Sequence, residues 1–383
     1  MHKRTSVPSV LFGIDLNWRR PQLLIFTTLM TMAGLVACSA EQGGLDAEVQ
    51  ELNRESVDIG TGQLVSPATA VRSYFGIPYA APPVGNLRWR APQPATQWNE
   101  VKLADTPGPA CTQPARAPRS LFPDPFERKS EDCLYLNVWT TADQGDDHPV
   151  MVWFHGGGWV LGDLEIADGV SRHLTVGAGC VVVSVDYRLA PETKFPGPAD
   201  DCYAGTQWAA QNAAAINGDP AKIAVGGDSA GGNLATVICL MARDQNGPAL
   251  AFQLLVYPVT LRDFDTVSYE ENADGYSLTR DSMRWFWDHY LASEADASNP
   301  YAAPMQAESL KGLPPALVIT AEYDPLRDEG EDYAHRLQDE GVSTKCTRYD
   351  GMMHGFFANP SVFDKGKIAV DEASAAMKGA FGR

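Results

Sequence analysis

The stretch AVGGDSAGGNLATVICL, residues 224–240, sets one serine between an apolar run typical of a strand and a longer run typical of a helix. Small residues surround Ser229 and leave little side chain around its hydroxyl. A serine in such a turn is either packed tightly for structural reasons or exposed for chemistry. The flanking runs favour exposure, because a G-x-S-x-G turn between a strand and a helix is a strained elbow that presents the serine oxygen.

A serine hydroxyl is a weak nucleophile until a base removes its proton, so Ser229 requires a histidine and an acid that orients it. In this arrangement the acid, and then the histidine, follow the serine along the chain. Three histidines follow it. His289 and His335 fall in helix-like segments, whereas His354 lies in the loop DGMMHGFF after a predicted strand. We therefore predict that His354 is the base.

The candidate acids lie in the stretch ALVITAEYDPLRDEG and are Glu322, Asp324 and Asp328. Asp324 comes three residues after the predicted strand and directly before Pro325, which keeps it in a loop. Asp328 begins the next helix, where a carboxylate is typical of a cap or first turn. The sequence therefore predicts that Asp324 is the acid.

Attack on a carbonyl group develops a negative oxygen, which fixed N–H donors must stabilise. The stretch VWFHGGGWV, residues 152–160, places three glycines after a predicted strand, so that the backbone can approach a substrate closely. We predict that the N–H groups of Gly157 and Gly158 form the oxyanion hole with the N–H of Ala230. His155 precedes the serine and is predicted to be structural.

Strand-like and helix-like runs alternate beyond the N-terminal third. The predicted strands are 134–139, 150–155, 180–187, 222–227, 252–258, 316–321 and 344–349. The predicted helices are about 199–215, 230–244, 328–340 and 366–380. Near-continuous apolar strands that alternate with helices indicate an α/β fold, with a mostly parallel central sheet and helices on both faces.

An insertion at about 262–304 interrupts this alternation. Its segment 279–291 is predicted to be helical and carries Met, Trp, Phe and Tyr side chains. Bulky apolar residues on an insertion favour a cap over a pocket. The alternative is that these aromatic side chains simply pack onto the core.

Charge and composition narrow the possible partners. The 383 residues carry a formal net charge of −18, and no Lys/Arg-rich run appears in the body of the chain. Nucleic acid is therefore not an expected partner, because phosphate binding needs clustered cations. None of the cysteines shows metal-ligand spacing, and we expect no metal site.

The N-terminus has the layout of a bacterial export signal. Cationic residues precede the apolar run 23–37, which ends in Leu-Val-Ala-Cys and resembles a lipoprotein box. We predict a signal peptide over residues 1–37, a lipid on Cys38 and a polar tether over 38–50. This predicts an exported protein that is anchored to a bacterial membrane, with Ser39 favouring the outer membrane. The alternatives are an ordinary secretory signal and a buried N-terminal helix.

The seven cysteines fit an oxidising compartment. Cys111 and Cys133 sit in polar, loop-like contexts and are candidates for a disulfide. Four others lie in or beside apolar runs and are predicted to be inert core thiols, namely Cys180, Cys202, Cys239 and Cys346.

Taken together, the motifs HGGGW, DYRLAPE, GDSAGGN, ENADGY, EYDPLRDEG and HGF resemble the bacterial hormone-sensitive-lipase family of α/β-hydrolases over residues 150–380. That resemblance implies an α/β-hydrolase fold and cofactor-free hydrolysis of carboxylic esters, usually with short to medium acyl chains. It implies the triad Ser229, Asp324 and His354. It also implies an oxyanion hole formed by Gly157, Gly158 and Ala230, as predicted above from the residues themselves. In DYRLAPE, it implies structural roles for Arg188 and Glu192.

The N-terminal third differs from that family. The stretches YFGIPYAAPPVGNLRWRAPQP, residues 74–94, and SEDCLYLNVW, residues 130–139, resemble type-B carboxylesterases. That resemblance implies a disulfide between Cys111 and Cys133. We therefore expect a type-B-like segment at about 51–145 on a hydrolase domain that extends to residue 383.

These observations predict a serine carboxylesterase that acts on a small ester. A serine amidase, peptidase or lactonase could use the same triad, and no sequence feature separates these activities. A non-catalytic, cholinesterase-like binding protein would be expected to have lost a triad residue, and all three residues are present.

Overall fold

The structure is a computed structural model that describes residues 54–67, 71–114, 128–141 and 147–382. These ranges belong to one compact unit, Asn53–Arg383. The predicted signal peptide, Cys38 and the tether lie outside the described residues. No helix in the described ranges has the length and apolar character that a membrane span requires.

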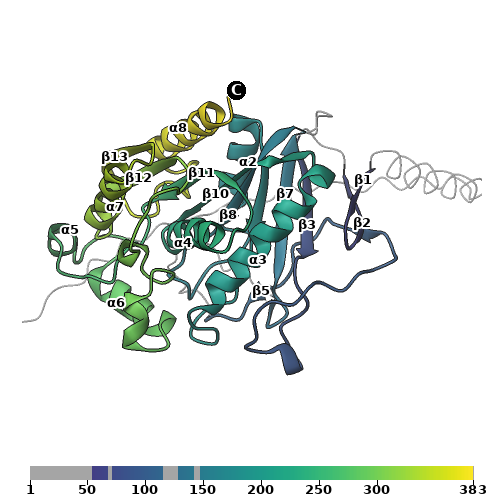
Figure 1. The fold of residues 1–383 in the computed structure, drawn as a ribbon, viewed down its shortest axis with the longest axis horizontal. Coiled ribbons are helices and arrows are strands. Elements are labelled where there is room, and N and C mark those ends of the chain that lie inside the picture. Colours follow the sequence, from purple (N-terminus) through teal and green to yellow (C-terminus); the bar gives the residue numbers. More distant parts are fainter. Residues whose placement is uncertain (1–53, 68–70, 115–127, 142–146, 383) are drawn as a thin grey trace, which may run out of the picture. The chain divides into compact units, whose positions relative to one another are not determined.

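An eight-stranded sheet forms the centre of this unit, in the order β13-β12-β11-β10-β8-β9-β7-β3 (Figure 1). In chain order its strands are β3 (Val71–Pro78), β7 (Tyr135–Thr141), β8 (His148–Phe154), β9 (Val181–Val185), β10 (Gly218–Asp228), β11 (Leu250–Val256), β12 (Ala316–Tyr323) and β13 (Thr344–Met353). Neighbours from β13 to β9 pair in parallel, whereas β7 pairs antiparallel with both β9 and β3. The prediction of a mostly parallel sheet is confirmed.

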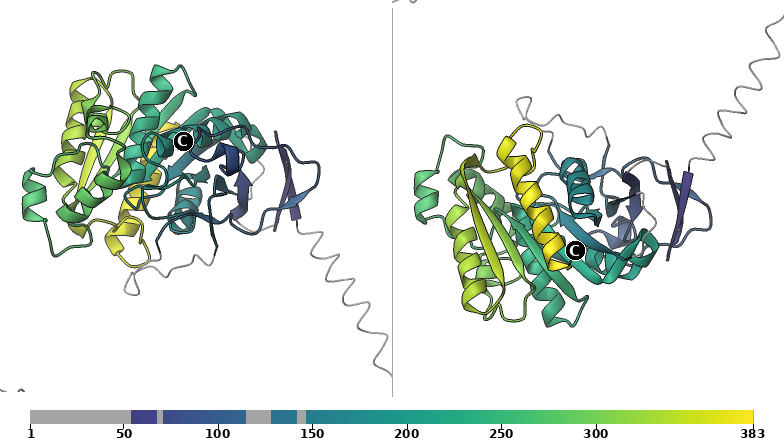
Figure 2. Two further views of the ribbon diagram at one scale, coloured as in Figure 1. Left: turned by 90° about the horizontal axis from the view of Figure 1, so that it is seen from below. Right: turned by 90° about the horizontal axis from the view of Figure 1, so that it is seen from above.

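Helices cover both faces of the sheet. Successive side chains of β8 point to opposite faces, so Val150 and Val152 join one apolar cluster while Met151 and Trp153 join the other. The first cluster includes side chains of α3 (Gly197–Asn212), α4 (Ala230–Asp244) and α7 (Arg327–Asp339). The second includes side chains of α2 (Asp168–Ala178) and α8 (Asp364–Ala380), and Figure 2 shows α8 crossing that face in yellow. Burial on both faces explains the near-continuous apolar strands.

Some elements were not predicted from the sequence. Helix α2 contains two glycines and several β-branched residues, which are weak helix formers, and packing of Val170 and Leu174 against the sheet offsets this propensity. Short elements also occur in the N-terminal segment, namely β1 (Arg54–Ile59), β2 (Gly62–Pro67), η1 (Gly85–Leu87), β4 (Lys102–Leu103), β5 (Ala110–Cys111) and β6 (Lys129–Ser130). A short helix, η2 (Ala214–Ile216), follows α3.

The predicted insertion lies between β11 and β12. It contains α5 (Val267–Glu271), α6 (Arg280–Tyr290), η3 (Glu294–Ser298) and η4 (Pro304–Gln306). Thr279 begins α6 with a capping box, because its hydroxyl accepts from the N–H of Ser282 and the Ser282 hydroxyl accepts from the N–H of Thr279. The buried face of α6 packs Trp287 and Tyr290 against Trp159, which follows the glycine loop after β8.

Candidate active site

Ser229 occupies the sharp turn between β10 and α4, with φ 58° and ψ −119°. Such a backbone conformation is strained for any residue other than glycine. The surrounding structure holds it, because the Ser229 N–H donates to the carbonyl of Val256 at 2.9 Å and the Ser229 carbonyl accepts from the N–H of Asn233 at 3.0 Å. The turn leaves Ser229 7% exposed.

The glycines around Ser229 permit close contact between the elbow and the end of β8. A Cβ added to Gly227 would lie 2.5 Å from the carbonyl oxygen of Phe154, and one added to Gly231 would lie 2.0 Å from the same atom. Real Cβ atoms do not approach a backbone oxygen this closely. The small residues around Ser229 are therefore required for the elbow to pack against the loop that follows β8.

The structure brings the three predicted triad residues together. Nδ1 of His354 lies 2.7 Å from Oδ2 of Asp324, and Nε2 of His354 lies 2.9 Å from Oγ of Ser229. The three residues follow β10, β12 and β13, whose carboxyl ends meet at one edge of the parallel sheet. A neutral imidazole that donates its Nδ1–H to Asp324 leaves Nε2 free to accept the Ser229 proton.

Asp324 is fully buried, and its Oδ1 accepts a hydrogen bond from the N–H of Leu326 at 2.9 Å. The other candidate acids bind elsewhere. Oε2 of Glu322 accepts from the N–H of Gly351 at 2.6 Å, and Oδ2 of Asp328 accepts from the N–H of Ser268 at 2.7 Å. Neither carboxylate contacts His354.

The glycine loop after β8 carries the predicted oxyanion donors. Gly157 and Gly158 have φ values of 108° and 63°, which favour glycine. No described residue accepts a hydrogen bond from either of their N–H groups. Ala230 begins α4, so its N–H is among the helix donors that lack an intrahelical partner.

Three further residues support the triad and were not identified from the sequence. The ring of Tyr257 lies 4.4 Å from the imidazole of His354. Two residues of the insertion bind the triad loops: Asn272 Nδ2 donates to the carbonyl of Asp324 at 3.4 Å, and Ser277 Oγ donates to the carbonyl of His354 at 2.7 Å. The only sequence signal for Asn272 and Ser277 was the stretch ENADGYS, residues 271–277, which contains both of them.

Buried carboxylates lie close to the triad. Burial raises the pKa of Asp228, whose Oδ1 accepts from the N–H of Gly156 at 3.1 Å. Burial also raises the pKa of Glu329, whose Oε1 accepts from the N–H of Thr260 at 2.7 Å. Both carboxylates accept hydrogen bonds from backbone N–H groups, and these bonds hold the loops beside the triad.

His155 is fully buried and stacks on Tyr187 with ring centroids 4.3 Å apart. Its Nε2 lies 3.3 Å from Oδ1 of Asp186. Burial lowers the pKa of His155, but the hydrogen bond to Asp186 and the charge of that carboxylate raise it by more, so the net pKa lies above its ordinary value. These contacts agree with the structural role predicted for His155.

Arg188 of the DYRLAPE motif forms a buried ion pair. Its Nε and Nη2 bind the two carboxylate oxygens of Asp201 at 2.7 and 2.6 Å, and its Nη1 donates to the carbonyl of Arg90 at 2.8 Å. The motif therefore ties α3 to the N-terminal segment. The side chain of Glu192 is exposed and lines a pocket together with Arg88 and Cys111.

Cys111 and Cys133 are bonded in the structure, with an S–S distance of 2.10 Å. Of the other described cysteines, Cys180, Cys202 and Cys239 are buried as predicted. Cys346 is only partly buried, since it lies on the edge strand β13, and burial raises its pKa to about 11. Within the described ranges, no three His, Cys, Asp or Glu side chains are placed to hold a metal ion.

Residues 151–358, more than half of the chain, match the family described as the alpha/beta hydrolase fold. The chain belongs to this family. It is 46% identical to the carboxylesterase NlhH of Mycobacterium tuberculosis over 237 residues, which cover 61% of this chain and 74% of that relative. It is 44% identical over 212 residues to an arylesterase of Saccharolobus solfataricus, covering 55% of this chain and 69% of that one.

A solved structure of an esterase from Pyrobaculum calidifontis is also similar, at 47% identity and a TM-score of 0.62, over 64% of this chain and 79% of that one. The match of the family and of its esterase relatives confirms the resemblance to hormone-sensitive lipases. The family match begins at residue 151, so it does not extend to the N-terminal segment, whose resemblance to type-B carboxylesterases stays a prediction.

Proposed function

We propose that this protein is a serine carboxylesterase in which Ser229 is the nucleophile. The observation that carries this proposal is the continuous chain from Ser229 through His354 to Asp324, at 2.9 and 2.7 Å. Its family relatives include carboxylesterases and arylesterases, which supports an ester as the substrate.

The reaction proceeds in two halves. His354 accepts the Ser229 proton while Oγ attacks the ester carbonyl, and the imidazolium then protonates the leaving alcohol. Water attacks the acyl-enzyme through the same steps in reverse. Asp324 orients the imidazole and stabilises its charged form, while the N–H groups of Gly157, Gly158 and Ala230 stabilise the developing oxyanion.

The insertion acts as the cap of this site, and the acyl chain is short to medium. Helix α6 supports this assignment, because the ring of Phe286 lies so close to Gly158 that a Cβ on that glycine would be 2.2 Å from it. A large side chain therefore restricts the space beside the oxyanion donors.

The test is hydrolysis of p-nitrophenyl esters from acetate to dodecanoate by the chain from Ser39 onward and by its Ser229→Ala variant. We expect activity that declines for the longest chains, and no activity above background in the variant. The control is Ser298→Ala, which alters a serine of η3 outside the site and keeps full activity. Equal hydrolysis by wild type and Ser229→Ala would refute the proposal.

A matched ester and anilide with the same acyl group separate the esterase from an amidase or peptidase on the same triad. We expect cleavage of the ester at a much higher rate, since an amine is the poorer leaving group. A lactone of similar size tests the third activity. Faster cleavage of the anilide or of the lactone would reassign the substrate while keeping Ser229 as nucleophile.

We further propose that the protein is exported and carries a lipid on Cys38 after removal of residues 1–37. The support is the sequence pattern Leu-Val-Ala-Cys at the end of an apolar run, together with the pairing of Cys111 and Cys133, which fits an oxidising compartment. Mass spectrometry of the N-terminal peptide from the membrane fraction tests this. Recovery of unmodified Cys38 from that fraction would contradict it.

A further inference from the structure

The side chain of Gln113 binds both backbone polar groups of Gly162. Its Oε1 accepts from the Gly162 N–H at 3.0 Å, and its Nε2 donates to the Gly162 carbonyl at 2.8 Å. Gln113 is only 7% exposed, so water does not compete freely for these groups. Two simultaneous hydrogen bonds fix both the position and the orientation of Gly162.

Gly162 ends the turn that begins at the predicted oxyanion donors. The carbonyl of Gly157 accepts from the N–H groups of Val160 at 3.2 Å and Leu161 at 2.9 Å. A Cβ on Gly162 would lie 2.5 Å from Nδ1 of His155, so this end of the turn also packs against the residue at its start. A displacement of Gly162 would therefore be transmitted to Gly157.

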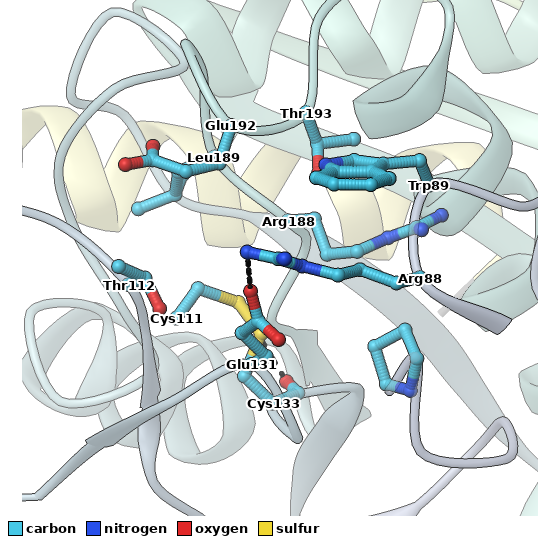
Figure 3. Close-up of a pocket in the computed structure, with 11 residues that line it drawn as sticks. Arg88, Trp89, Cys111, Thr112, Glu131, Cys133, Arg188, Leu189, Glu192 and Thr193 are labelled. Carbon is cyan, nitrogen blue, oxygen red and sulfur yellow. Dashed lines mark hydrogen bonds and ion pairs between the residues drawn. A yellow bond between two sulfur atoms is a disulfide. The ribbon is translucent and has the colours of Figure 1, made fainter. Parts of the chain in front are cut away.

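The segment that carries Gln113 is itself tied down. Cys111, two residues earlier, is bonded to Cys133, and β5 pairs with β6 at this point. Cys133 lies just before β7, an internal strand of the central sheet. Figure 3 shows the disulfide in the lining of a pocket, below the ion pair of Arg88 and Glu131.

We propose that Gln113 is a positioning residue for the oxyanion hole, and that the disulfide-tied N-terminal segment thereby aligns the N–H groups of Gly157 and Gly158. Gln113 and the disulfide lie outside the family match of residues 151–358. The groups proposed to align the oxyanion donors therefore come from a part of the chain that the match does not include. The inference rests on the proposed esterase function, because only acyl transfer gives these N–H groups an oxyanion to bind.

A purely structural role for Gln113 makes different predictions. Loss of packing would lower the melting temperature and the fraction of active protein, but each correctly folded site would keep its turnover and its affinity for a transition-state analogue. A positioning role lowers turnover at each site. It also weakens binding of any ligand that places a negative oxygen in the hole, while the KM of the ester changes little.

The experiment compares wild type with Gln113→Met, which keeps the length of the side chain. This change removes both hydrogen bonds to Gly162, together with a longer one from Nε2 to the carbonyl of Cys111 at 3.3 Å. Active sites are titrated by the p-nitrophenol burst, and kcat and KM are measured with p-nitrophenyl butyrate. The inhibition constant is measured for a trifluoromethyl ketone, whose hemiketal with Ser229 carries the oxyanion. We expect kcat per titrated site to fall roughly 10- to 100-fold, and the inhibition constant to rise by a similar factor.

Gln93→Met is the matched control, because Gln93 is exposed and lies in the same segment. Its side-chain Nε2 donates to the neighbouring carbonyls of Ala91 and Pro92. Unchanged kcat and inhibition constant per titrated site in Gln113→Met would overturn the proposal. Equal losses in Gln113→Met and Gln93→Met would overturn it as well. Absence of a burst and of Ser229-dependent hydrolysis in wild type would instead refute the proposed function.

Two further variants keep the test open if Gln113→Met does not fold. Gln113→Asn retains an amide that is too short to span both groups of Gly162, and we expect the same loss of kcat. The pair Cys111→Ser and Cys133→Ser releases the segment. If the disulfide acts through the same turn as Gln113, the loss of kcat in the combined variant will be smaller than the product of two losses. These are the loss in the cysteine pair and the loss in Gln113→Asn. A full product would place the disulfide outside this mechanism and refute that part of the proposal.

Discussion

In the proposed mechanism, Asp324 acts through the imidazole of His354, to which its fully buried side chain is hydrogen-bonded. Its Oδ2 fixes Nδ1 at 2.7 Å, while its Oδ1 is held by the N–H of Leu326. Both carboxylate oxygens are therefore committed, and the orientation of the imidazole depends on this one buried side chain.

Asp324→Asn should lower kcat by about 10³- to 10⁴-fold, because an amide favours the wrong imidazole tautomer and cannot stabilise the imidazolium. Steady-state hydrolysis of p-nitrophenyl butyrate measures this loss. Asp328→Asn is the control, since Asp328 accepts from Ser268 and does not contact His354. Similar losses in the two variants would show that the effect comes from the β12–α7 loop as a whole.

Asp163 makes folding stability depend on pH. It is 3% exposed, and its Oδ1 accepts from the N–H groups of Glu165 at 3.0 Å and Ile166 at 3.3 Å. Burial, followed by the charge of Asp186, raises the pKa of Asp163 to about 7. The folded state therefore binds its proton more tightly than the unfolded state does. The resulting stability is present at low pH and is lost as the pH rises through about 7.

Asp163→Asn should remove this loss, because the amide oxygen still accepts hydrogen bonds but carries no charge. Relative to wild type, the variant should gain on the order of 2 kcal/mol in free energy of unfolding between about pH 5 and pH 8. Urea unfolding at the two pH values measures the difference. A constant difference between variant and wild type across this range would exclude Asp163 as the source.

Helix α6 combines a buried and an exposed surface that were not separable in the sequence. Its helical character follows from the spacing of its apolar residues and from the capping box at Thr279. Two neighbouring aromatic residues of α6 differ in environment, and only tertiary packing decides which of them is covered. Phe286 contacts Gly158, while the side chain of Trp285 is 44% exposed. The helix therefore presents Phe286 to the glycine loop after β8 and the preceding Trp285 to solvent.

Phe286→Ala should widen the site beside Gly158 and shift the preference toward longer acyl chains. We expect the ratio of kcat/KM for p-nitrophenyl octanoate over acetate to rise roughly tenfold. Trp285→Ala removes a ring of similar bulk from the solvent side and should leave this ratio unchanged. If the octanoate-to-acetate ratio rose only in Trp285→Ala, the acyl pocket would have to be assigned to the other side of α6.

Most of the central strands were predictable because burial on both faces produces continuous runs of Val and Ile. Such runs can be identified without knowing which strands pair with each other. Helix α2 was not, since its residues have weak helix propensity and its stability comes from contacts with the sheet and with α8. The direction of β7 was also undetermined, because alternation of side chains is the same in parallel and antiparallel strands.

The N-terminal segment is part of the central sheet. Strand β7 lies between β9 and β3, and its residues Val138 and Trp139 are fully buried on opposite faces. The unit that includes the site therefore begins well before the family match at residue 151.

A chain of residues 147–383 should fail to fold, although it retains the triad and the glycine loop. Removal of β3 and β7 would expose the edge of β9 and the apolar surface that covers Trp139. Residues 53–383 are the control and should give a cooperative thermal transition followed by circular dichroism. A similar transition in the shorter chain would show that the N-terminal segment is dispensable for folding.

Short-range patterns in the sequence were enough to predict the strand–turn–helix around Ser229, the α/β alternation and the order of the triad, because spacing, turn chemistry and strand burial are local properties. The distances within the triad, the supports from Tyr257, Asn272 and Ser277, and the Gln113–Gly162 pair required the tertiary structure. The two residues of that last pair are 49 positions apart, and no periodicity connects them. They meet because the disulfide, the sheet and the glycine turn are packed together, and such contacts depend on how distant segments fold against one another.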